Sequence, residues 1–266
     1  MNTIIIPIDF SPGSENAMHY GAQLAGELNA SVVLVHIYQV PITMNDMPVM
    51  IFSADESKNS ADTGLERCRE ELQQNYPELT IATESRLGSV AEEVHLIAKE
   101  KNPLAIVMGS QHTRGLERML FGSTTASVIR HAHYPVFAIP LDFKKTAIKN
   151  IVLAADLEDT PVPICHKIIE LVQLLGASLH IVHVKIKEDA ERPEKLLEKM
   201  STLSPSYQSI DNKKVKDGLE KYVQEVNADL LIFLPHEHNL IERMFFKVHT
   251  EDIITNTRIP ALAIKA

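Results

Sequence analysis

Apolar and polar positions form two alternating patterns along the first half of the chain. Short continuous apolar runs, such as 4–8 and 31–38, are typical of parallel strands buried on both faces. Longer amphipathic segments follow them, and Ser11-Pro12 supplies a helix cap and a first-turn proline. The pattern predicts strands at 4–8, 31–38, 80–85, around 106 and at 135–139, and helices at 12–28, 58–75, 90–100 and 123–132.

Strict alternation of strand and helix predicts an α/β fold: an open parallel five-stranded sheet with helices on both faces. Gly88-Ser89 introduces the third helix, and Ser123 is expected to cap the fourth. Residues 41–57 are rich in Pro, Met, Asn and Ser and are expected to form a loop.

The same pattern occurs twice. Residues 2–9 resemble 150–156, and 31–36 resemble 178–183, both at an offset of 147 positions. Three later segments, at 103–108, 117–119 and 135–139, recur at an offset of 125. Five matches in the same order indicate a duplication. The expected domains are 1–141 and 150–266, joined by a polar linker, and the second copy lacks 22 residues where the first carries 41–60.

Composition narrows the function classes. A length of 266 residues favours two compact units, and 45% hydrophobic with 23% charged residues is typical of a soluble globular protein. The net charge of -9 argues against nucleic acid as a partner. No run approaches the ~20 apolar residues that span a bilayer, and the amino terminus does not resemble a signal peptide. Cys68 and Cys165 lie far apart without a CxxC motif, so we expect a reduced, cytoplasmic setting.

The loop at 109–124 is the candidate site for an anion. Ligands of open parallel sheets bind beyond the carboxyl ends of the strands. Gly109 and Gly122 would let the backbone approach a phosphate, and the helix that begins near Ser123 would donate N–H groups to it. Ser123 and Thr124 add hydroxyl donors, while positive charge would come from His112, Arg114 and Arg118. The loop after the first strand, 9–13, lacks the GxGxxG fingerprint of dinucleotide folds.

At these residues the chain resembles the universal stress protein family, in its tandem, two-domain form. The loop is similar to that family's ATP signature, G-x2-G-x9-G-[ST]: Gly109, Gly122 and Ser123 fit, and His112 replaces the middle glycine. Both halves resemble the family end to end, including Pro7-x-Asp9, His36 and Gly88. The resemblance implies an adenine nucleotide alpha hydrolase-like, Rossmann-like fold that binds ATP with Mg²⁺.

The resemblance also implies which residues would hold the nucleotide. Adenine would contact Pro7, Asp9 and the backbone of Ile37, and ribose would contact Met108 and Gly109. The phosphates would contact Gly122, Ser123 and Thr124. A non-glycine residue with positive φ costs roughly 1–2 kcal/mol, so His112 either closes the loop or, protonated, binds phosphate itself.

The second copy has lost this chemistry. At the offset of 125, Gly109 becomes Leu234, His112 becomes Glu237, and Gly122 with Ser123 become Lys247 with Val248. We therefore expect ATP to bind in the first domain and not in the second.

The leading hypothesis is a stress-response protein whose ATP occupancy signals to a protein partner that the sequence does not name. The alternatives are a nucleotide-independent interaction protein with vestigial loops and, with weaker support, a second half that binds a metal or small ligand near His236 and His238. No four-ligand metal spacing is visible, and His180 and His183 fall on opposite faces of one strand.

No nucleophile elbow, catalytic dyad or P-loop lysine is present, so we expect a protein that is not an enzyme, and slow ATP turnover has no assignable residue. The fifth strands, 135–140 and 260–265, are expected to pair the two halves as a pseudo-two-fold dimer within one chain, with association of whole chains left open.

Overall fold

The computed structural model describes residues 2–40, 54–110, 122–144, 147–155, 160–185, 193–235 and 259–265. The first half contains β1 (Thr3–Pro7), α1 (Pro12–Glu27), β2 (Ser31–Tyr38), α2 (Ala54–Asn75), β3 (Ile81–Leu87), α3 (Val90–Lys101), β4 (Ala105–Gly109), α4 (Ser123–His131) and β5 (Val136–Ile139). The second contains β6 (Asn150–Ala154), α5 (Val162–Leu175), β7 (Ser178–Lys185), α6 (Glu194–Lys199), a 3-10 turn (Ser201–Leu203), β8 (Ser206–Asp211), α7 (Val215–Glu225), β9 (Leu230–Phe233) and β10 (Ala261–Ala263).

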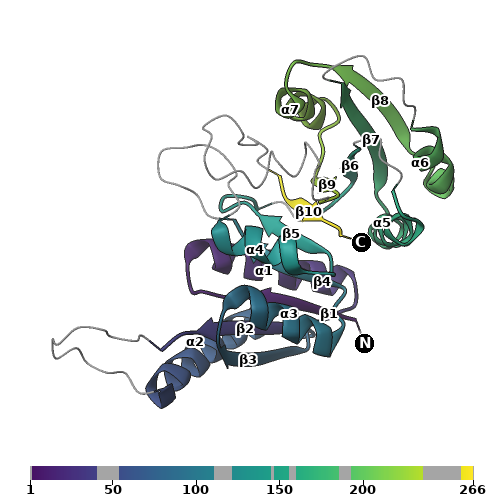
Figure 1. The fold of residues 1–266 in the computed structure, drawn as a ribbon. Helices are drawn as coiled ribbons and strands as arrows, with labels where there is room; N and C mark the ends of the chain where they lie inside the picture. The colour runs from purple at the N-terminus through teal and green to yellow at the C-terminus, as the bar shows by residue number, and fades with distance from the viewer. Residues whose placement is uncertain are drawn as a thin grey trace, which may run out of the picture.

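The ten strands of the described residues form one sheet, in the order β3-β2-β1-β4-β5-β10-β9-β6-β7-β8 (Figure 1). Each set of five is parallel, as the sequence predicts, and the two sets meet at an antiparallel pair in which Phe137 of β5 faces Leu262 of β10. The two five-stranded sheets are therefore halves of a single ten-stranded one.

Helices cover both faces of this sheet because alternate strand residues point to opposite sides. Ile4 and Ile6 join a core with α1, α2, α5 and α6, whereas Ile5 joins a second core with α3, α4 and α7. Both cores run through both halves. None of the described helices has the length and apolar character needed to cross a bilayer.

The repeat offsets hold at the level of single residues. β6 and β7 begin 147 positions after β1 and β2, and β8, β9 and β10 begin 125 positions after β3, β4 and β5. The shortening therefore lies between the second and third strands of the second half. Part of it falls in the helix, since α2 has 22 residues and α6 has six.

Two local predictions were wrong. Residues 54–57, expected to belong to a loop, form the first turn of α2, where Asp55 and Glu56 are favourable at the positive end of the helix dipole. Ser123 does not cap α4: Gly122 is the N-cap, with an extended backbone (φ −55°, ψ 154°), and Ser123 is the first helical residue. The Ser11 cap and its first-turn proline are present as predicted.

Candidate functional site

The carboxyl ends of β1, β2 and β4 lie next to one another in the first half. β1 pairs with β2 on one side and with β4 on the other, and the last registered pair of β1 and β2 is Pro7 with Val35. β2 continues through Tyr38 beside β3, so the main chain of Ile37 extends past the end of β1. This edge holds most of the predicted nucleotide contacts that the structure describes.

A tight turn presents Asp9 at the end of β1. Asp9 Oδ1 accepts hydrogen bonds from Ser11 N (3.0 Å) and Ser11 Oγ (2.5 Å), and Asp9 N donates to Ser14 Oγ (3.3 Å). Burial raises the pKa of Asp9, but hydrogen bonds from Ser11 and Ser14 outweigh it and hold the pKa below the ordinary value. The side chain is exposed, so a charged carboxylate faces the space beyond the strands.

Two residues that the sequence analysis did not assign to the site support this turn. Phe10 adopts the left-handed conformation (φ 60°), and its ring lies 4.5 Å from that of His36. His36 Nδ1 donates to Ile8 O at 2.7 Å, which ties β2 to the end of β1.

The third support is Gly64, inside α2, where an added Cβ would lie 2.5 Å from Phe10 Cζ. A glycine inside a helix is unfavourable by about 1 kcal/mol. The presence of Gly64 in an otherwise helical sequence was therefore the signal that could have revealed a close contact with α2 at this position.

We expect Ser11→Ala to lower the free energy of unfolding by about 1 kcal/mol and to raise the pKa of Asp9. The substitution removes the cap on Ser14 N and a donor to Asp9 Oδ1. Because the folded pKa is lowered, the Asp9 contribution is full above about pH 4 and is lost as the pH falls through the folded value.

Urea unfolding and an NMR titration of the Asp9 carboxyl would measure both effects. Ser89→Ala is the matched control, since Ser89 occupies the N-cap of α3 without a side-chain hydrogen bond. Equal losses in the two variants would contradict the assignment.

Two helix N-termini converge on the end of β4. An added Cβ at Gly109 would lie 2.4 Å from Gly13 O and 3.0 Å from Ser14 N, so the first turn of α1 packs directly against Gly109. On the other side, Thr125 Oγ1 of α4 donates to Gly109 O at 3.0 Å. Position 109 must therefore be glycine for the start of α1 to pack this closely against β4.

The first turn of α4 is the candidate anion contact. Gly122 has no side chain that could cap the helix, and no side chain among the described residues caps its first N–H groups, which can therefore donate to an external acceptor. Ser123 and Thr124 are exposed beside them. This arrangement of amides and hydroxyls at a positive helix end suits a phosphate.

The predicted site residues differ in accessibility. Asp9, Ser123 and Thr124 are exposed, whereas Pro7, Ile37 and Met108 are buried and can offer only backbone or edge contacts. His112 lies outside the described residues, as do Arg114 and Arg118.

The second half retains part of the scaffold without the open end. His183 Nδ1 donates to Ala155 O at 2.9 Å, as His36 does to Ile8. Leu234, however, is buried where the first half has Gly109. Asp156, His236, Glu237, His238, Lys247, Val248 and His249 lie outside the described residues.

The histidine predictions can be followed on β7. His180 and His183 point to opposite faces of the strand. Alternate residues share a face, so His180 lies on the face of Val182 and His183 on the face of Ile181, and these two residues belong to different cores. Among the described residues, no three His, Cys, Asp or Glu side chains are grouped to hold a metal ion.

Comparison with known proteins agrees with this architecture. Residues 1–140 match the model of the universal stress protein family. A universal stress protein of Methanocaldococcus jannaschii is 30% identical over 142 residues, which cover 51% of this chain and 80% of that protein. Universal stress protein G of Escherichia coli is 29% identical over 144 residues, which cover 52% of this chain and 97% of that protein.

The likeness in fold extends over the whole chain. A crystal structure of a universal stress protein from Archaeoglobus fulgidus superposes with a TM-score of 0.76 at 16% identity, covering 99% of this chain and 98% of that one. The family match covers more than half of the sequence and the structural match covers both halves. The chain belongs to the universal stress protein family.

Proposed function

We propose that the first half binds an adenine nucleotide, ATP with Mg²⁺, and that occupancy of this site regulates contact with a protein partner in the cytoplasm. The observation that carries the proposal is the convergence of two helix N-termini on the end of β4, where α4 begins with exposed Ser123 and Thr124 and has no capping side chain in the part of the chain that the structure describes. Family membership of residues 1–140 supports the choice of a nucleotide.

The charges of the site fit the two ends of such a ligand. Amides and hydroxyls at the start of α4 would donate hydrogen bonds to the phosphates. Asp9 is held ionised by its serine donors, which bond to Oδ1, and its Oδ2 would accept a hydrogen bond from the adenine amino group. The edges of Ile37 and Met108 would flank the base and ribose, and Pro7 would lie beneath the base.

The proposal assigns the two halves different roles. The second half would not bind ATP, because Leu234 fills the position of Gly109. It would instead hold the first half through the β5–β10 pair, so that one chain is the working pseudo-dimer of domains 1–141 and 150–266. We assign no catalytic residue.

Gly122→Asp is expected to abolish ATP binding while the fold remains intact. The φ of Gly122 is −55°, a backbone conformation that non-glycine residues adopt without strain, and aspartate is a favourable N-cap. Its carboxylate would occupy the phosphate position and repel the ligand. Isothermal titration of nucleotide-stripped protein with ATP and Mg²⁺ should give about one site per chain for the wild type and none for the variant.

Gly122→Asn is the matched control, because asparagine caps equally well without charge. We expect binding at least ~10-fold tighter than in the aspartate variant, a difference of about 1.4 kcal/mol. Absence of wild-type binding at millimolar ATP would sink the proposal and favour a nucleotide-independent interaction protein.

A further inference from the structure

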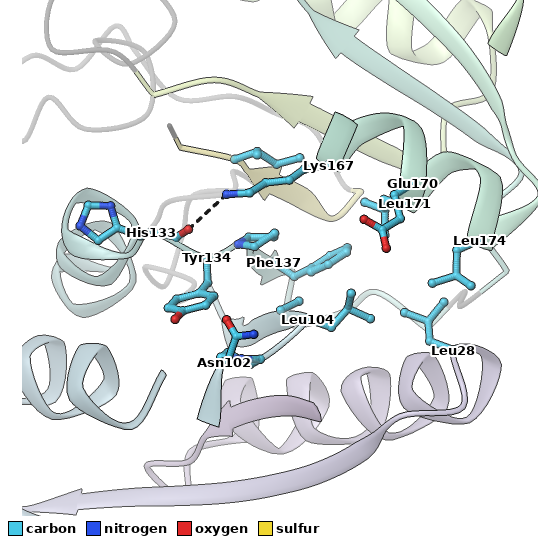
Figure 2. Close-up of a pocket in the computed structure, with 14 residues that line it drawn as sticks. Leu28, Asn102, Leu104, His133, Tyr134, Phe137, Lys167, Glu170, Leu171 and Leu174 are labelled. Atoms are coloured by element: carbon cyan, nitrogen blue, oxygen red, sulfur yellow. Dashed lines mark hydrogen bonds between the residues drawn. The ribbon is translucent and has the colours of Figure 1, made fainter. Parts of the chain in front are cut away.

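A cavity lies at the opposite end of the strands from the proposed nucleotide site, between the two halves. It has a volume of about 260 Å³ and is bounded by the starts of β4 and β5, the end of α1, and one face of α5 (Figure 2). Nothing in the proposed nucleotide function uses it.

The walls of the cavity are apolar. Leu28, Leu104 and Phe137 of the first half face Leu171 and Leu174 of α5 (Figure 2). Phe137 is 1% exposed and Leu28 is 4% exposed, whereas Leu174 is 46% exposed. The deep part of the cavity is therefore formed by ordered core residues, and Leu174 lies at its mouth.

The duplication supplies an internal comparison. At the offset of 147, Lys167 of α5 corresponds to Tyr20 of α1, and Leu171 corresponds to Leu24. Tyr20 is 4% exposed, and its ring lies 6.5 Å from Phe137 and 6.1 Å from Phe143. Burial raises the pKa of Tyr20, with smaller contributions from Glu27 and Asp229.

A buried aromatic ring thus occupies the corresponding position of α1. On α5 the same position carries a lysine that extends to the rim. The lysine at the rim of the cavity is therefore particular to α5 and is not shared by the two copies of the repeat.

Lys167 lacks a strong partner in the part of the chain that the structure describes. Its side chain is half-buried, and its Nζ donates to His133 O at 3.5 Å, the upper limit of a hydrogen bond (Figure 2). No described carboxylate lies within ion-pair distance of this ammonium, and Glu170, one turn further along α5, is exposed to water. A cation at the edge of an apolar cavity is complementary to an anion with an apolar body.

We propose that this cavity binds a small amphiphilic carboxylate, with its apolar chain or ring among the leucines and Phe137 and its carboxylate on Lys167. A cavity of 150 Å³ accommodates benzene, so 260 Å³ suits about ten non-hydrogen atoms. Because both halves form the walls, the bound molecule would bridge them.

Octanoate is the probe. Octan-1-ol and octylamine, which have the same chain length and a neutral or positive head group, are the comparison ligands. The chain contains no tryptophan, so Leu174→Trp at the cavity mouth provides a fluorescence reporter without background. Leu96→Trp is its control, since Leu96 is equally exposed (45%) on α3 and does not line the cavity. Octanoate should change the emission of Trp at position 174 in a saturable way and leave that at position 96 unchanged.

Variants that change a charge, made in the protein that carries Leu174→Trp, distinguish binding at Lys167 from unspecific partitioning of octanoate into apolar surface. Lys167→Met should weaken octanoate binding about tenfold and leave octan-1-ol unaffected. Glu170→Gln should strengthen octanoate binding about twofold by removing a neighbouring negative charge. Lys99→Met, an exposed lysine of α3, should change nothing.

Three results would overturn the proposal: no saturable response to octanoate at 10 mM in the folded reporter, octylamine binding as tightly as octanoate, or equal affinities in the Lys167 and Lys99 variants. Circular dichroism checks the fold of each variant. Titration of octanoate into the unsubstituted chain by calorimetry confirms that the reporter itself does not create the site.

Discussion

Replacing Phe137 by alanine should lower the free energy of unfolding by about 4 kcal/mol and destabilise both halves together. Phe137 is 1% exposed in β5 and faces Leu262 across the junction with the second half. Its removal leaves a cavity in a core that runs through α1, β5 and α5. Urea unfolding followed by circular dichroism should show one transition, shifted to lower denaturant.

Leu96→Ala is the control for this experiment. Leu96 is 45% exposed, and substitutions at such positions change stability by about 0.5 kcal/mol or less. If Phe137→Ala instead gave two separate transitions, with one half unaffected, the two halves would not share a cooperative core.

Gly109→Ala is expected to cost about 2–3 kcal/mol of stability and to abolish nucleotide binding. The added Cβ would lie 2.4 Å from Gly13 O and 2.6 Å from Gly13 C. These are backbone atoms at the start of α1, so the helix itself must shift away from β4. The same shift would displace the turn that carries Asp9.

Gly26→Ala provides the opposite case. Gly26 also lies in α1, and nothing lies within 4 Å of an added Cβ. Alanine there should stabilise the helix by about 0.5–1 kcal/mol and leave binding unchanged. Stability and ATP affinity of both variants can be measured by urea unfolding and calorimetry. If Gly109→Ala bound ATP with wild-type affinity, the end of β4 would not be part of the nucleotide site.

The sequence predicts the sheet well because each strand is specified locally. Continuous apolar runs define β1 and β2, and the repeat offsets place β6 and β7 147 positions later without error. The first helix is equally local, since Ser11 and Pro12 define its start. The start of α2 was missed because its first turn, Ala-Asp-Glu-Ser, has the composition of a loop.

The site is less predictable because its geometry depends on contacts between distant segments. Gly109 was expected to let the backbone approach the ligand and to contact the ribose, yet its lack of a side chain serves the packing of α1. The stack of Phe10 on His36 and the bond from Thr125 to Gly109 have no signature in local sequence. Family resemblance supplied the positions, and the structure supplied the reasons for several of them.

The antiparallel pair of β5 and β10 has a consequence for how the protein responds to dilution. Two separate domains joined at such an edge would dissociate at low concentration. Here the partner is tethered to the same chain, so the junction forms at an effective concentration set by the linker and is independent of protein concentration. The sequence that follows β9 in the second half can therefore change freely, provided that β10 continues to cover the edge of β5.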